Sequence, residues 1–324
     1  MKIINVSGFG NTGCTSQADY LSEFSGVRGI LQDQSRNTAV TLAPYQEFGV
    51  LKCVHSFGGL IINSTHKLNR NITKESLRLS LLGHSIVGYD EMSHGELVHL
   101  KKRELLSCEL GEDYIATVDK AVSYFPANYN QMDTLELVSI VRAMFQEWYE
   151  GVSNIILKKN PECEIIGLKN DPPGAFPLIA SLLPNGVSSA ILRNPLDTGW
   201  DFLRHYKMEY SKDNIEWFSR HYNSQLNSAK SQILRYRDHI GDSYFVHDFE
   251  TFVSSDSHRK KYAERMIGKN NNVFRLFFNE TNSRKNINVY KSLDKNQIDM
   301  LSALSLPVYE DFKQFVNSQG LFFR

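Results

Sequence analysis

The chain has 324 residues, with 36 basic and 36 acidic side chains and a formal net charge of zero. This balance excludes the strong basic field that attracts nucleic acid, so nucleic acid is not expected as a partner. No apolar run reaches the roughly 18 residues that a bilayer requires, and the first residues lack the pattern of a secretory signal. We therefore expect a cytoplasmic protein without an integral membrane segment. The four cysteines are scattered, with no histidine at ligand spacing, so no metal site is predicted.

The first predicted element is an apolar strand over residues 3–6, which runs through a glycine-rich and hydroxyl-rich turn into a helix. Backbone N–H groups in such a turn, together with the positive end of the helix dipole, bind phosphate or sulfonate. Gly8, Gly13 and Thr15 match the spacing of a nucleotide phosphate-binding loop. Cys14, however, occupies the position where nucleotide-hydrolysing enzymes have a lysine. The turn is thus predicted to bind an anion without the usual ammonium group.

Helical patterns dominate from about residue 65 to residue 159. Asp133 followed by Glu136 is typical of a capping box, and the apolar residues from 137 to 152 recur at helical spacing. A second long helix is predicted from residue 214 to residue 239, ending at Gly241. Both helices are interpreted as scaffold.

Three further buried strands are predicted, at residues 164–168, 189–192 and 244–247. Lys169, Arg193 and Asp248 follow these strands as Gly8 follows the first. Because ligands bind outside the carboxyl ends of parallel strands, we expect these four residues to approach one crevice. The alternation of strands and helices, without repeats, predicts one α/β domain.

Arg193 and Lys169 also have structural interpretations. Arg193 could form an ion pair with Asp197, which is also a candidate cap for the following helix, with Pro195 near its start. Lys169 could be a solvated cation at the end of a strand. The sequence leaves these alternatives open.

Several of these pieces, in this order, resemble sulfotransferases that use 3′-phosphoadenosine 5′-phosphosulfate (PAPS). The pieces are the loop after the first strand, Lys169-x-x-x-Pro173 with the later Leu183-Pro184, and the run from Arg193 to Asp197. Residues 244–252 look like the late strand of that family, and residues 283–291 are similar to its basic donor-binding segment. The likeness covers the first 25 residues and most of the chain after residue 160, and is nearest to uncharacterised bacterial sulfotransferase-like proteins.

The resemblance implies a P-loop, three-layer α/β/α fold with a central, mainly parallel sheet. Residues 1–324 would form a single domain, with residues 65–160 as a helical insertion that provides the acceptor region. The implied reaction moves a sulfuryl group from PAPS, as the donor co-substrate, to a hydroxyl or amine of a small-molecule or carbohydrate acceptor, without metal. A carbohydrate or glycolipid precursor is the expected acceptor.

The resemblance also assigns the donor site. Arg193 would hold the 3′-phosphate, since a guanidinium can donate two parallel hydrogen bonds to it. Ser283, Arg284 and Lys285 would close over that group. The 5′-phosphosulfate would be held by the loop residues Gly10, Asn11, Thr12, Gly13, Cys14, Thr15 and Ser16.

The chain departs from the family pattern at two donor-site positions. Asn11 replaces a basic residue, and Lys169 is the expected substitute. Asp201 replaces a serine that binds the 3′-phosphate, and its charge would repel that group. Arg204 lies three residues further on, with His205 beside it, and is expected to offset this charge from the same helical face.

The catalytic base is assigned to Asp171, in the place of a family histidine, with Glu47 as the alternative. A carboxylate can remove the acceptor proton if burial raises its pKa toward the working pH. Asp171 is equally well interpreted as a turn former before two prolines.

Two other functions fit the sequence. A P-loop kinase or NTPase would use Asp248 to hold Mg²⁺, although Cys14 in the loop argues against it. A non-catalytic nucleotide-binding protein of the same fold is consistent with Asn11 and Asp201, because a fold alone does not establish function.

Overall fold

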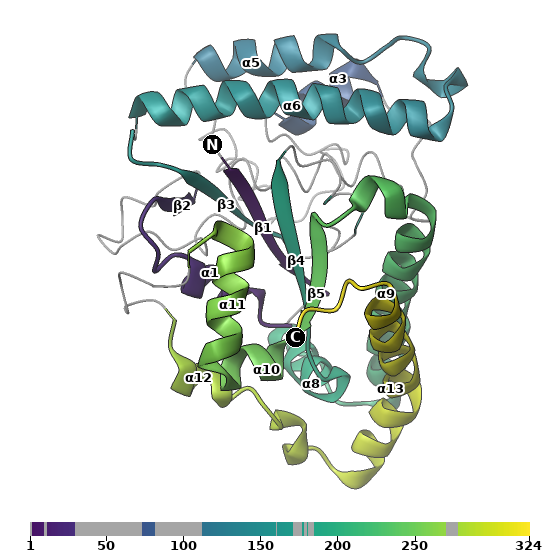
Figure 1. The fold of residues 1–324 in the computed structure, drawn as a ribbon. Helices are drawn as coiled ribbons and strands as arrows, with labels where there is room; N and C mark the ends of the chain where they lie inside the picture. The colour runs from purple at the N-terminus through teal and green to yellow at the C-terminus, as the bar shows by residue number, and fades with distance from the viewer. Residues whose placement is uncertain are drawn as a thin grey trace.

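A parallel β-sheet forms the centre of the fold in the computed structural model (Figure 1). The structure describes residues 2–9, 12–29, 73–81, 112–159, 161–170, 177, 180, 185–269 and 278–324. In this part of the chain the sheet has five strands in the order β2-β3-β1-β4-β5, and every neighbouring pair is parallel. The strands are β1 (Lys2–Gly8), β2 (Val27–Gly29), β3 (Ile165–Asn170), β4 (Gly186–Leu192) and β5 (Tyr244–Asp248).

The four strands predicted from apolar runs are confirmed. β2 was not predicted, because three residues are too few to give a periodic signal. β1 and β4 are buried on both faces of the sheet, which explains why most of their residues are apolar. Their polar residues are buried too and bond across the two strands: the Asn5 amide donates to the Ser188 hydroxyl at 3.3 Å, and the Ser7 hydroxyl donates to the Ser189 carbonyl at 2.9 Å. In β1, Ile4 and Val6 pack in one hydrophobic cluster, and Ile3 packs in another on the opposite face.

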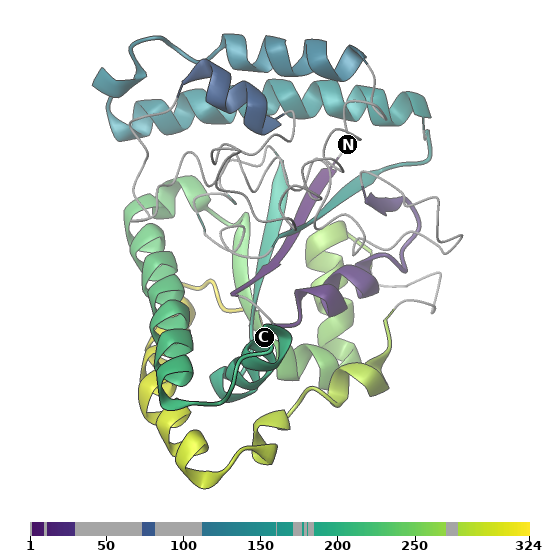
Figure 2. The same cartoon turned by 180° about the vertical axis from the view of Figure 1, so that it is seen from behind.

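Helices cover both faces of the sheet, an arrangement compatible with a three-layer α/β/α fold (Figures 1 and 2). One cluster joins the sheet to α1, α10 and α11, and the other joins it to α8, α9 and α13. These helices are α1 (Cys14–Leu21), α8 (Pro195–His205), α9 (Lys212–Ile240), α10 (Phe249–Ser254), α11 (Asp256–Ile267) and α13 (Lys295–Ser318). Two short helices, α12 (Glu280–Arg284) and η5 (Val289–Ser292), precede α13.

A second group of helices lies beyond the amino ends of the strands (Figure 1). It consists of α3 (Lys74–Leu81), α5 (Glu112–Ser123), η4 (Tyr129–Gln131) and α6 (Thr134–Lys159). The Asp133 carboxylate accepts a hydrogen bond from the backbone N–H of Glu136 at 3.1 Å, as the capping pattern predicts. The predicted apolar stripe of α6 is fully buried, so this helix is confirmed as scaffold.

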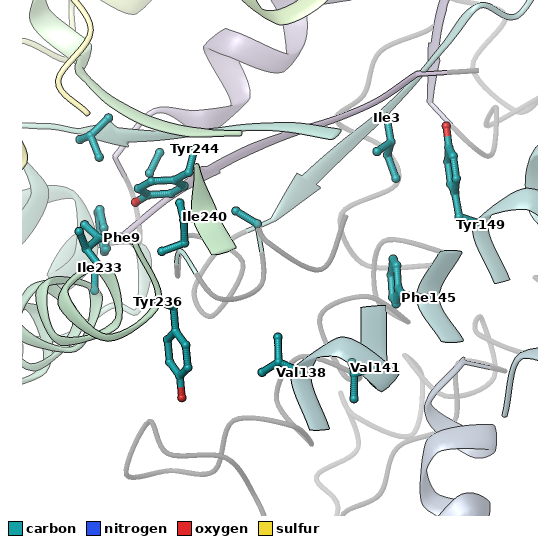
Figure 3. Close-up of a cluster of buried hydrophobic side chains, with 14 of the residues drawn as sticks. Ile3, Phe9, Val138, Val141, Phe145, Tyr149, Ile233, Tyr236, Ile240 and Tyr244 are labelled. Carbon is teal, nitrogen blue, oxygen red and sulfur yellow. The ribbon is translucent and has the colours of Figure 1, made fainter. Parts of the chain in front are cut away.

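The two predicted long helices contribute to one hydrophobic core (Figure 3). α9 ends at Gly241, whose positive φ of 51° suits a glycine, as predicted. Val138, Val141, Phe145 and Tyr149 of α6, Ile233, Tyr236 and Ile240 of α9, and Ile3 and Tyr244 of the sheet belong to this core. None of the helices in the described ranges is long and apolar enough to cross a membrane.

Candidate functional site

The strand order creates a topological switch point between β1 and β4. From β1 the chain passes to β2 on one side of the sheet, whereas from β4 it passes to β5 on the other side. The register brings the carboxyl ends of the strands to one edge: Gly8 is opposite Ile191, and Leu192 is opposite Asp248. Ligands of open parallel sheets bind at such a point, since the connections diverge there and leave a crevice.

The loop between β1 and α1 needs glycine at two positions. A Cβ atom on Gly8 would lie 2.0 Å from the Thr12 hydroxyl oxygen, because Thr12 folds back over the end of the strand. Gly13 has a φ of 93°, and a Cβ there would lie 2.4 Å from the ring of Phe249. Only glycine fits both positions. The tight turn brings the start of α1 to the switch point, as an anion-binding loop requires.

Thr12 is the most informative side chain in this loop. It is fully buried, and its hydroxyl oxygen has no hydrogen-bond partner in the structure as described. Burying an unsatisfied hydroxyl costs about 1–3 kcal/mol, so such groups are rare unless a ligand uses them. Beside it, Cys14 is buried and Thr15 is exposed.

Arg193 follows β4 and is 2% exposed. Its guanidinium forms an ion pair with Asp201 of α8 and donates a second hydrogen bond to the Asn286 carbonyl at 2.5 Å. It also lies over the Phe249 ring, 5.3 Å from the centroid. These contacts hold the buried Arg193 guanidinium in place. The Phe249 ring also packs against Gly13, so Arg193 lies next to the loop.

The alternative ion pair of Arg193 with Asp197 is not the one that forms. The carboxylate of Asp197 instead accepts the backbone N–H groups of Asn288 at 2.9 Å and Tyr290 at 3.1 Å. Asp201, one helical turn further along α8, takes the ion pair with Arg193. The Asp201 charge is thus compensated by Arg193 in this structure.

The direct partner of Asp201 is Arg193, not Arg204. The Arg204 guanidinium lies over the Trp200 ring at 4.9 Å, and Arg204 and His205 are both exposed.

The predicted cap of α8 is wrong. The side chain of Asn194 caps the helix by accepting the N–H of Leu196 at 2.9 Å, whereas Asp197 lies inside the first turn. Pro195 is the first helical residue, as predicted. The sequence signal for this cap is that asparagine ranks with aspartate as an N-cap residue and here directly precedes the proline.

The segment 283–290 is held against the other parts of the site. The hydroxyl groups of Ser283 and Ser16 lie 3.1 Å apart and share a hydrogen bond. Further along, the Asn286 carbonyl binds Arg193, and Asp197 binds two backbone N–H groups of the segment. Pieces of chain separated by up to 267 positions therefore meet at the switch point.

Arg284 and Lys285 contact side chains of their own short segment. Arg284 forms an ion pair with Glu280 at 2.6 Å, and Lys285 donates to the Asn282 side chain at 3.3 Å. Both are exposed.

Two acidic residues lie at the carboxyl end of β5: Asp248 is its last residue, and Glu250 is in the first turn of α10. Asp248 accepts an ion pair from Lys313 at 2.9 Å and a hydrogen bond from the Tyr309 hydroxyl at 3.4 Å. The side chain of Glu250 accepts the backbone N–H of Asn194 at 2.9 Å. Burial raises the pKa of Glu250, although the hydrogen bond from Asn194 opposes this shift. Sequence reasoning missed Glu250, whose position two residues beyond a strand end was the available signal.

Several predicted site residues remain predictions. Gly10, Asn11, Glu47 and Asp171 lie outside the described residues. The structure describes only the backbone of Lys169, which belongs to β3 opposite Val6 of β1. The choice of base and the role of Lys169 therefore stay predictions.

Comparisons of this chain with protein-family models, with curated proteins and with solved structures find no match. Within the described ranges, no group of three or more His, Cys, Asp or Glu side chains could hold a metal ion.

Proposed function

We propose that the protein is a sulfotransferase of P-loop fold that uses PAPS as donor. The observation that supports this most is the meeting of the sequence segments that carry the resemblance. Arg193 and Phe249 link the β4 and β5 segments, Phe249 packs against Gly13 of the loop, and Ser283 bonds to Ser16. The proposal requires these segments to contact one another around a single ligand, and the three contacts agree with that requirement.

In this proposal the loop after β1 holds the 5′-phosphosulfate. The hydroxyl of Thr12 and the backbone N–H groups at the start of α1 donate to its oxygens. The loop contributes no ammonium group, because Cys14 occupies the position of the usual lysine. Arg193 binds the 3′-phosphate through its guanidinium fork.

The proposed reaction breaks the bond between sulfur and the bridging phosphate oxygen, and the electron pair leaves with the phosphate. The acceptor hydroxyl or amine forms the new bond to sulfur and loses its proton to a base, for which Asp171 and Glu47 remain the candidates. Donor N–H and O–H groups stabilise the charge that builds on the leaving phosphate. The acceptor we favour is a carbohydrate or glycolipid precursor.

The kinase or NTPase alternative needs Asp248 as a ligand of Mg²⁺. That carboxylate already forms an ion pair with Lys313 and a hydrogen bond with Tyr309, so a metal would have to displace both. This arrangement favours the sulfotransferase proposal over phosphoryl transfer.

A non-catalytic nucleotide-binding protein is the second candidate. The ion pair between Arg193 and Asp201 favours it, because a compensated guanidinium attracts a phosphate less strongly than a free one.

Calorimetry on the full chain separates these functions. Adenosine 3′,5′-bisphosphate should bind without divalent metal, and ATP with Mg²⁺ should bind more weakly. Metal-dependent ATP binding with no bisphosphate binding would reject the proposal. Transfer of labelled sulfate from PAPS to a panel of sugars, phenols and amines then decides between the sulfotransferase and the non-catalytic protein.

A further inference from the structure

Asp201 and Arg193 differ sharply in exposure. The Arg193 side chain is 2% exposed, whereas the Asp201 side chain is 26% exposed. The ion pair thus joins a buried cation to a partly exposed carboxylate. A ligand anion that binds the Arg193 guanidinium would have to compete with this carboxylate.

We propose that Asp201 is a specificity-determining residue that competes with the ribose phosphate of the ligand for Arg193. This inference rests on the proposed function, because it takes the bound nucleotide to carry a phosphate on its ribose as well as at its 5′ position. The phosphate binds when the Asp201 side chain leaves the guanidinium, and a nucleotide without that phosphate leaves the ion pair intact.

The position of Arg193 does not depend on Asp201 alone. The Asn286 carbonyl accepts one of its N–H groups, and the Phe249 ring lies against the guanidinium. These contacts keep the guanidinium oriented toward the site when the carboxylate moves away. Arg193 is therefore already placed for an incoming anion.

The backbone around Asp201 need not move either. α8 is fixed at its start by the Asn194 cap, and Asp197 binds the 288–290 backbone. Rotation of one partly exposed side chain is enough to release the ion pair, and water can solvate the released carboxylate. The cost of this release appears as a lower affinity for the phosphate.

The test compares Asp201→Asn with the wild-type chain, using adenosine 3′,5′-bisphosphate and AMP as probes in calorimetry. The asparagine keeps the shape of the side chain and removes its charge. We expect the bisphosphate to bind about tenfold more tightly to the variant, which corresponds to about 1.4 kcal/mol. AMP, which lacks the ribose phosphate, should change by less than about twofold. Glu209→Gln removes an equal charge from the exposed loop after α8 and should leave both affinities unchanged.

Thermal unfolding distinguishes competition from a purely structural role. Free Asp201→Asn protein should melt at a lower temperature, because Arg193 loses its ion-pair partner, yet its melting temperature should rise more on addition of bisphosphate. A loss of affinity together with the loss of stability would overturn the proposal. Asp201→Ser provides the same comparison if the asparagine variant does not fold.

The remaining outcomes are also decisive. Equal tightening of AMP and bisphosphate would show a general charge effect and overturn the assignment to the ribose phosphate. If the bisphosphate binds equally tightly to the wild type and the variant, the role of Asp201 is overturned but the proposed function is not. No bisphosphate binding to either chain overturns the proposed function and this inference together.

Discussion

Replacing Thr12 with valine is the sharpest test of the loop, because it should raise the free energy of unfolding and lower the affinity for the bisphosphate. The hydroxyl oxygen is buried without a hydrogen-bond partner among the described residues, and valine has nearly the same shape. Removing an unsatisfied buried hydroxyl recovers part of a penalty of about 1–3 kcal/mol, so we expect the free energy of unfolding to rise by about 1 kcal/mol. The melting temperature should rise by about 2 °C.

The same substitution should reduce ligand binding. A hydrogen bond from a hydroxyl to a charged phosphate contributes about 1.5–3 kcal/mol, so the affinity for adenosine 3′,5′-bisphosphate should fall at least about tenfold. Urea unfolding measures the first quantity, and calorimetry measures the second.

Thr198→Val is the matched control. Thr198 is also fully buried, but its hydroxyl donates to the Asn194 carbonyl at 3.0 Å. Losing this satisfied bond should lower the free energy of unfolding by about 1 kcal/mol, which is opposite in sign to Thr12→Val. If Thr12→Val destabilises the chain as Thr198→Val does, the hydroxyl has a structural partner and our reasoning is refuted. Unchanged bisphosphate affinity would remove Thr12 from the site.

Three further predictions follow from the same contacts. Gly13→Ala should destabilise the protein by about 1–3 kcal/mol in urea unfolding, because its positive φ is strained for alanine and the new Cβ collides with Phe249; a neutral effect would contradict the loop geometry. Arg193→Lys keeps the charge but loses the guanidinium fork, so bisphosphate affinity should fall about tenfold while circular dichroism stays the same; full affinity would exclude Arg193 as a ligand. Stability should also decrease in acid, since burial lowers the pKa of His247 and of His258. The unfolded chain then binds more protons than the folded chain below about pH 6.5, so the free energy of unfolding falls as the pH drops, by at most about 1.4 kcal/mol per histidine and pH unit. His247→Phe should reduce this slope in urea unfolding at pH 7.5 and 5.5, and an unaltered slope would refute the assignment.

The sequence predicted the scaffold well because its signals are local. Apolar runs predicted four of the five strands in the described residues, and helical spacing with terminal signals predicted α6 and α9. The shared edge was also predicted, since the carboxyl ends of parallel strands lie together, but the strand order that creates the switch point was not. The three-residue strand β2 was missed because it depends on pairing with β3 and has no pattern of its own.

Contacts within the site were harder to predict because they depend on side-chain directions between distant elements. Asp197 and Asp201 lie one turn apart on α8, and only the packing of the 286–290 segment decides which of them meets Arg193. Asp248 and Lys313 likewise form an ion pair although they are 65 positions apart in the sequence (313 − 248), so no local pattern predicts it. The sequence predicted that these residues lie at one edge of the sheet, but it did not predict which of them form pairs.

A crystal structure of the full chain with adenosine 3′,5′-bisphosphate tests the central claim most directly. We predict the 5′-phosphate at Thr12 and the start of α1, the 3′-phosphate on Arg193, and Asp201 turned away from the guanidinium. A bisphosphate bound elsewhere on the molecule, with the ion pair between Arg193 and Asp201 intact, would contradict it.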